Sequence, residues 1–304
     1  MTTKKVLKTR WFLLVFSLIA VSASIYLTKK PNKPPVSSDT IEWQGSPFLG
    51  SDVIRKGNLN GIPIAVPSNY LYFPFQYLDK SIWEAPKPGD KPYSQRTYED
   101  AVGAFSIYVH WPDMRPRNRE NNFSFLTKDK NGGNDWLMVS VESDYILRPR
   151  PPETVDNYHA RLLRKIMDRL SAKPVDGGPW GAREKVEVRY EQRGQDERTG
   201  LNWAEPVGPY TELFHTWNQA LYWQGDKGAV VTDLIECDSG KFSNSEIYHN
   251  CRHQFEFSAM KTYVILSYPR TKLSQWRELK AKSQALLLGF KTDKTILSQE
   301  GNLQ

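Results

Sequence analysis

The densest group of residues that could do chemistry surrounds two cysteines. Cys237 is followed by His249, Cys251 and His253. On a strand, positions 249, 251 and 253 would share one face, so two thiols and two imidazoles could meet there. However, His-x-Cys-x-His is not a usual zinc spacing, and side chains at neighbouring strand positions diverge. We therefore predict a disulfide between Cys237 and Cys251, with a zinc site and free thiols as the alternatives.

The predicted disulfide agrees with the compartment that the N-terminus indicates, because paired cysteines are typical of exported proteins. The bridge would close a loop of about 15 residues and add roughly 3 kcal/mol on the chain-entropy account.

Aromatic and arginine side chains form a second group of interest. The chain holds 10 Trp, 15 Tyr and 13 Phe, and the run of residues 70–77 is too dense in aromatic rings to bury on one strand face. Core packing explains such residues in a large β-rich body. The alternative is a recognition surface, since Trp, Tyr and Arg dominate binding hot spots. The candidate partner-binding residues are Tyr70, Tyr72, Phe75, Tyr77, Arg115, Arg117, Arg119, Trp217 and Trp223.

Motifs of catalysis are missing from the sequence. It has no Gly-x-Ser-x-Gly elbow, no His-Glu-x-x-His, no phosphate-binding glycine loop and no dinucleotide fingerprint. We accordingly predict no catalytic, metal-binding or cofactor-binding residues and no enzymatic activity. A hydrolase built from carboxylates without a motif stays open as an alternative.

Residues 11–28 are uncharged and largely apolar, with four basic side chains before them and Lys29 and Lys30 after them. A helix of that length just crosses a bilayer. The small residues 21–23 would also suit signal-peptide cleavage. We predict an uncleaved anchor whose flanking charges leave the body outside the cytosol. The expected localisation is a single-pass inner-membrane protein with its body in the periplasm, in contact with the lipid bilayer through residues 11–28.

The expected organisation is a cytoplasmic tail (1–10), a transmembrane anchor (11–28), a Pro-rich stalk (29–45), a periplasmic body (46–290) and a flexible tail (291–304). The formal net charge is +7, but residues 1–30 hold six of the 41 basic groups and no acidic ones. The rest of the chain is nearly neutral. Because a nucleic-acid binder carries its excess charge on the folded domain, we do not expect nucleic acid as a partner.

The body mixes strand and helix patterns. Residues 104–111 alternate, with Phe105, Ile107 and Val109 on one face and Tyr108 and His110 on the other. Apolar stripes predict amphipathic helices over 153–171 and 272–290. Further strands are expected at 136–142, 186–190, 229–237, 254–258 and 262–268. The predicted class is α+β: antiparallel sheets with two amphipathic helices packed on them, behind a transmembrane helix, with two similar lobes as one reading.

Three segments carry a family resemblance: residues 57–67, residues 235–237 with 251–255, and residues 268–276. Together they resemble membrane-anchored periplasmic immunity proteins associated with type VI secretion effectors, some of which are paired with lipase toxins. The resemblance implies a membrane-tethered periplasmic protein that neutralises a secreted effector toxin, with a phospholipase as one candidate, by direct stoichiometric binding. An envelope scaffold or assembly protein is the alternative that the same anchor and aromatic surface would serve.

Overall fold

A computed structural model describes residues 53–80, 89–118, 120–121, 124–125, 135–143, 157–168, 170–174, 183–187, 189–207, 219–238 and 250–292. These residues belong to one compact unit, Phe48–Gln304. The expected tail, anchor and stalk (1–45) and the residues from 293 onwards lie outside the described part of the chain.

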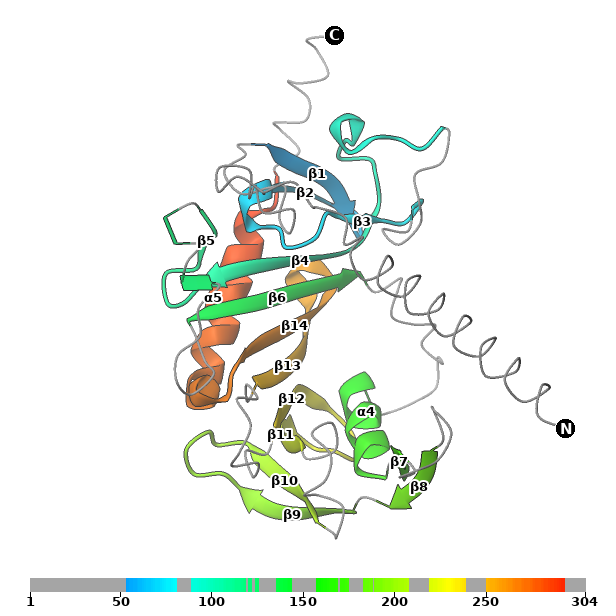
Figure 1. The fold of residues 1–304 in the computed structure, drawn as a ribbon, viewed down its shortest axis with the longest axis vertical. Helices are drawn as coiled ribbons and strands as arrows, with labels where there is room; N and C mark the ends of the chain where they lie inside the picture. Colours follow the sequence, from blue (N-terminus) through cyan, green and yellow to red (C-terminus); the bar gives the residue numbers. More distant parts are fainter. Residues whose placement is uncertain are drawn as a thin grey trace, which may run out of the picture. The chain divides into compact units, whose positions relative to one another are not determined.

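The main element is one antiparallel sheet of ten strands (Figure 1). The strand order is β3-β4-β6-β14-β13-β12-β11-β10-β9, and β5 pairs with β4 beside this path. In chain order the strands are β3 (Gln76–Tyr77), β4 (Val102–His110), β5 (Arg115–Pro116), β6 (Trp136–Ser143), β9 (Arg189–Gln195), β10 (Asn202–Val207), β11 (Gln219–Gly225), β12 (Val231–Asp238), β13 (Asn250–Phe257) and β14 (Thr262–Pro269).

Smaller elements complete the described residues. Two two-stranded sheets pair β1 (Ile54–Leu59) with β2 (Ile62–Pro67), and β7 (Leu170–Pro174) with β8 (Arg183–Glu187). Short 3₁₀ turns are η2 (Ser68–Tyr70), η3 (Tyr93–Gln95), η5 (Ser258–Met260) and η6 (Arg270–Gln275). The α-helices are α4 (Tyr158–Met167), capped by the Asn157 side chain, and α5 (Trp276–Gly289).

The two helices cover opposite faces of the large sheet (Figure 1). Helix α5 packs on the main core, where Leu279 and Leu287 meet inward residues of β4, β6, β14, β13 and β12. Helix α4 packs through Leu163 on Leu221 and Leu234, which point to the other face. Because successive strand residues point to opposite faces, alternation in the central strands supplies both cores.

The expected α+β class is wrong, because the described chain is mainly β. Both predicted helices exist but are shorter than expected: α4 ends at Met167 before β7 begins, and η6 takes up the start of the second. Strands that no alternation revealed, including β1, β2, β10 and β11, shift the balance towards sheet. The two-lobe interpretation also fails, because β6 pairs directly with β14 and joins the two halves in one sheet.

Most of the strands expected from alternation are present. The expected strands at 104–111, 136–142, 229–237, 254–258 and 262–268 correspond to β4, β6, β12, β13 and β14, with ends shifted by a few residues. The expected strand at 186–190 falls across β8 and β9. In β4, Phe105, Ile107 and Val109 are buried against the α5 side as predicted.

The predicted disulfide is confirmed. Cys237 and Cys251 are directly opposite each other on β12 and β13, and their Cα atoms are 4.1 Å apart. Both are buried in the core under α5 and η6. The zinc and free-thiol alternatives are therefore wrong for these two residues, since both sulfur atoms are in the bridge.

The localisation expected from the N-terminus needs correction. Among the described residues, no helix has both the length and the apolar character needed to cross a membrane. This finding contradicts the expected single-pass inner-membrane protein with a periplasmic body. Residues 11–28, on which that expectation and the predicted bilayer contact were based, lie outside the described residues.

Candidate binding surface

The nine candidate partner-binding residues separate into three groups. Phe75, Tyr77 and Trp223 lie buried in the two cores. Arg119 and Trp217 lie outside the described residues. The remaining four are brought together near the end of β4, where η2 contacts β5: these are Tyr70, Tyr72, Arg115 and Arg117.

This end of β4 carries residues that reach solvent. We call the surface formed by Tyr72, Phe73, Tyr108, His110, Asp113 and Arg115 the β4 corner. Residues 71–73 run beside β4, because Leu71 forms a bridge with Ile107 and the Tyr72 amide donates to Ser106 O at 2.9 Å. Tyr108 and His110 point away from the core face of β4. Phe73 is 42% exposed, and Arg115 extends from the neighbouring strand β5.

Aromatic rings form a continuous series of contacts through the β4 corner. Centroid distances are 4.3 Å for Phe73–Tyr72, 4.7 Å for Tyr72–Tyr108 and 4.9 Å for Tyr108–Phe125. The series continues from Phe125 to Trp136 at 5.5 Å and from Trp136 to His110 at 5.3 Å. All five pairs meet edge-to-face, the arrangement that the ring quadrupoles favour. The series thus connects the exposed ring of Phe73 to the buried ring of Trp136.

Arg117 lies beneath this series of rings. Its guanidinium carbon is 4.1 Å from the centroid of Phe125, and its side chain is buried. Burial lowers the pKa of Arg117, while Tyr72 and Tyr108 act in the opposite direction. The guanidinium of Arg117 therefore stabilises the ring of Phe125 in this series through a cation–π contact.

Asp113 organises the charged side of the β4 corner. Its carboxylate accepts hydrogen bonds from His110 Nδ1 at 3.1 Å and from the Arg115 backbone N–H at 3.4 Å, and it pairs with Arg115 Nε at 2.8 Å. Burial would raise the pKa of Asp113, but the bonds from His110 and Arg115 lower it below its ordinary value. A charged Asp113 thus fixes the position of Arg115. Burial, and after it the charge of Asp113, raise the pKa of Tyr70, whose ring packs on Phe290 at 5.3 Å.

The turn that carries Asp113 is anchored on the rest of the fold. Met114 has a positive φ of 56°, and its amide donates to His110 O at 2.7 Å. From helix α5, Lys282 Nζ donates to Pro112 O at 3.1 Å and lies 4.7 Å from the ring of Trp111. These contacts hold the turn between β4 and β5 in one geometry.

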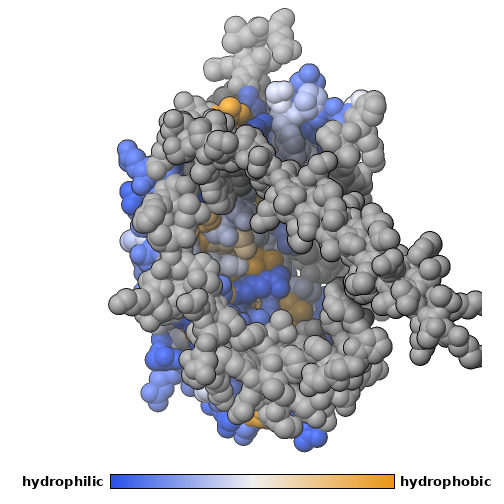
Figure 2. Space-filling view, in the orientation of Figure 1, coloured by the Kyte–Doolittle hydropathy of each residue, from blue (hydrophilic) through white to orange (hydrophobic). Residues whose placement is uncertain are grey.

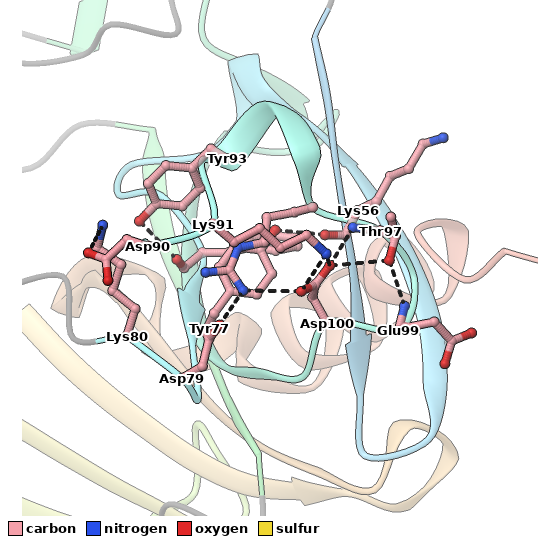
Figure 3. Close-up of polar contacts among 12 residues, drawn as sticks. Lys56, Tyr77, Asp79, Lys80, Asp90, Lys91, Tyr93, Thr97, Glu99 and Asp100 are labelled. Carbon is pink, nitrogen blue, oxygen red and sulfur yellow. Dashed lines mark hydrogen bonds and ion pairs between the residues drawn. The ribbon is translucent and has the colours of Figure 1, made fainter. Parts of the chain in front are cut away.

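A second polar cluster surrounds Asp100, just before β4 (Figure 3). Lys91 Nζ donates to Asp100 Oδ2 at 2.7 Å, and Arg96 Nη1 contacts both Asp79 (2.7 Å) and Asp100 (3.1 Å). Burial would raise the pKa of Asp100, but hydrogen bonds from Lys91, Thr97 and Arg96 lower it to about 2. Burial would lower the pKa of Arg96, but its bonds to the two carboxylates raise it overall.

The contacts of this second cluster with its neighbours indicate a structural role. Arg96 lies 4.3 Å from the ring centroid of buried Tyr77, whose hydroxyl donates to Lys56 O on β1 at 2.7 Å. The carbonyl of Asp100 accepts from the Asn58 amide at 2.8 Å. The cluster therefore ties the segment before β4 to the β1–β2 hairpin.

An aspartate, a histidine and a lysine meet between the sheet and α5, an arrangement that the sequence analysis missed. His253 Nε2 donates to Asp233 Oδ1 at 2.8 Å, and Lys280 Nζ donates to the same oxygen at 2.7 Å. Burial lowers the pKa of His253, and the bond to Asp233 offsets this only in part. Burial would raise the pKa of Asp233, but His253 and then Lys280 lower it to about 2. Such groups could move protons, but His253 and Asp233 are buried in the core.

The sheet face opposite α5 carries a third polar group. Tyr263 donates to Gln254 Oε1 at 3.0 Å, and Gln254 Nε2 donates to Glu236 Oε1 at 2.5 Å across three neighbouring strands. In the orientation of Figure 1, hydrophilic and hydrophobic residues lie side by side near the centre of the view (Figure 2). Within the described residues, no three His, Cys, Asp or Glu side chains gather in a way that could hold a metal ion.

Sequence reasoning missed Phe73 and Asp113 as parts of the surface, and it missed buried Trp136 as a ring that contacts His110. A signal existed for Tyr108 and His110, which alternation placed on the outward face of β4. For Phe73 and Asp113 the sequence offers no periodicity, because both lie in irregular segments whose position depends on β4 and α5.

Comparison with known proteins gives remote similarities in structure. No protein-family model and no curated protein matches the chain. An immunity protein of the Stenotrophomonas maltophilia type IV secretion system, Smlt3025, is similar with 16% identity and a TM-score of 0.45, over 80% of this chain and 94% of that one. The iron-regulated outer membrane lipoprotein FrpD of Neisseria meningitidis is similar with 13% identity and a TM-score of 0.35, over 82% and 97%.

At these scores, neither similarity carries an argument about function. Smlt3025 is an immunity protein by name, but of a type IV system. The finer expectation of a type VI, lipase-toxin immunity protein is not shown. The chain thus has a remote structural similarity to a secretion-system immunity protein.

Proposed function

We propose that this protein neutralises a secreted toxin by direct stoichiometric binding and does no chemistry itself. The observation that carries the proposal is the β4 corner, where exposed Phe73 and Arg115 stand on a fixed base of aromatic contacts and hydrogen bonds. The toxin as partner, with a lipase delivered by type VI secretion as the first candidate, comes from the resemblance of the three sequence segments.

The physical case for binding rests on residue type and preorganisation. Aromatic and arginine side chains supply most hot-spot energy in protein interfaces. Ordering a flexible side chain on binding costs about 0.5–1.5 kcal/mol. Phe73 is already packed on Tyr72, and Arg115 is already paired with Asp113, so part of that cost is met before the partner arrives.

The burial of Asp233 and His253 in the Asp233–His253–Lys280 group supports binding over catalysis. This group has the residue types of an acid–base centre, but His253 is enclosed between the sheet and α5. Its hydrogen bonds instead join β12, β13 and α5. We therefore assign it to stability.

Co-expression tests the proposal. Each protein encoded beside this gene is first produced alone in a sensitive host, and one that kills the host is taken as the effector. The effector is then produced with the full chain, with the F73A/R115A variant, or with the L288A control. Leu288 is 40% exposed on α5, close to the exposure of Phe73. We expect growth with the wild-type chain and with L288A, and death with F73A/R115A. Equal killing with and without the wild-type chain would contradict the proposal, and turnover of a lipid or glycan by the purified chain would contradict its non-catalytic part.

A further inference from the structure

Arg115 has hydrogen-bond donors left over for a partner. Its Nε pairs with Asp113 Oδ2 and its backbone N–H is directed to Asp113 Oδ1. Among the described residues, Asp113 is the ion-pair partner of Arg115, and the pair meets at Nε and not at the terminal nitrogens Nη1 and Nη2. The side chain is 55% exposed. The outer edge of the guanidinium thus presents N–H donors to solvent.

Contacts within the β4 corner orient this outer edge of the Arg115 guanidinium. Asp113 holds Nε, His110 holds Asp113, and Met114 N–H closes the turn on His110 O. A guanidinium oriented in this way matches the two oxygens of a carboxylate through paired N–H···O bonds. A phosphate group would bring about two negative charges close to Asp113, whereas a carboxylate brings one. The charge of Asp113 therefore favours a carboxylate over a phosphate.

Phe73 specifies the second feature of the ligand. It is exposed at the far end of the aromatic series that leads through Tyr72 and Tyr108 to the strand carrying His110. Covering this ring with an apolar side chain removes apolar surface from water, at about 25 cal/mol per Å².

We infer that the β4 corner binds a protein partner through an Asp or Glu carboxylate on the Nη groups of Arg115 and an apolar side chain on Phe73. This inference rests on the proposed function and names the chemistry of the toxin surface. Arg115 is the specificity element, and Asp113 is its positioning residue.

The test is a titration of the purified effector identified by co-expression into the full-length chain and its variants. R115A and R115K should each raise the dissociation constant about tenfold or more. Alanine removes the guanidinium, and lysine keeps the charge but lacks the planar pair of donors. The matched control is R198A. Arg198 is also an exposed arginine paired with an aspartate, with a side chain 74% exposed, but it lies in the turn between β9 and β10. R198A should bind within about twofold of wild type.

A double-mutant cycle identifies the carboxylate. Surface Asp and Glu residues of the effector are changed to Ala one at a time, and one of these changes should weaken binding to wild type but not to R115A. Melting temperatures equal to wild type establish that the Arg115 variants are folded. If the wild-type chain binds the effector and R115A and R115K bind it equally tightly, this inference is overturned and the proposed function stands. No complex with the wild-type chain overturns both.

Discussion

His253 donates a hydrogen bond from Nε2 to Asp233 Oδ1 at 2.8 Å, joining strands β13 and β12 beneath helix α5. Both side chains are buried, and Lys280 of α5 completes the group. The pair places two titratable residues where the sheet and its covering helix meet. Protonation there is coupled to folding.

The first prediction concerns stability between pH 7 and pH 5. Burial lowers the pKa of His253 below 6.5 in the folded protein, so the unfolded chain binds the proton first as the pH falls. The free energy of unfolding should therefore decrease as the pH drops below about 6.5. H253Q, which cannot titrate, should have a smaller decrease in urea unfolding measured across this range.

The control for this prediction is S283A, a change at a buried residue of α5 that, like H253Q, introduces no titrating group. It should keep the wild-type pH dependence. An H253Q variant with an unchanged slope would show that His253 does not set it.

The second prediction concerns Asp100 and low pH. The pKa of Asp100 is lowered to about 2, so the charged carboxylate contributes stability above its ordinary pKa of 3.8, and this is lost as the pH falls through about 2. D100N should lose about 1.5–3 kcal/mol of stability at neutral pH, the size of hydrogen bonds to a charged group. The difference from wild type should shrink towards pH 2. A constant difference from pH 7 to pH 2 would count against the assignment.

The third prediction separates buried from exposed aromatic residues in one short segment. F75A should destabilise the fold by about 3–5 kcal/mol, because it opens a cavity in the main core. F73A should change stability by about 0.5 kcal/mol or less, because Phe73 lies at the surface. Chemical denaturation measures both, and a large loss for F73A would place Phe73 in the core.

The fourth prediction concerns the disulfide. Replacing Cys237 and Cys251 together with Ala should lower the free energy of unfolding by about 3 kcal/mol, as expected for a loop of this size. Thiol labelling of the unreduced, denatured wild-type chain should find no free cysteine. Two labelled thiols per chain would disprove the bridge.

Local patterns predicted the pieces of this fold better than their assembly. Alternation identified β4, β6, β12, β13 and β14, because each has one face against the core under α5. The pairing of β6 with β14 could not be read from the sequence, since it joins residues far apart in the chain. That single pairing converts two apparent halves into one sheet.

The candidate surface was predictable only in part. The aromatic density of residues 70–77 drew attention to the right segment, but not to which rings are exposed. Phe75 and Tyr77 are both buried and their ring centroids are 5.9 Å apart, because residues two apart in an extended segment share a face. The role of Arg115 depends on Asp113, and that contact depends on the turn geometry at Met114.

The most direct test of the central claim is calorimetric titration of the purified effector identified by co-expression into the folded full-length chain. The account predicts one effector bound per chain, with binding abolished in F73A/R115A and kept in L288A and R198A. A complex that forms equally well with F73A/R115A, at an unchanged melting temperature, would contradict the claim that the β4 corner is the surface that neutralises the toxin.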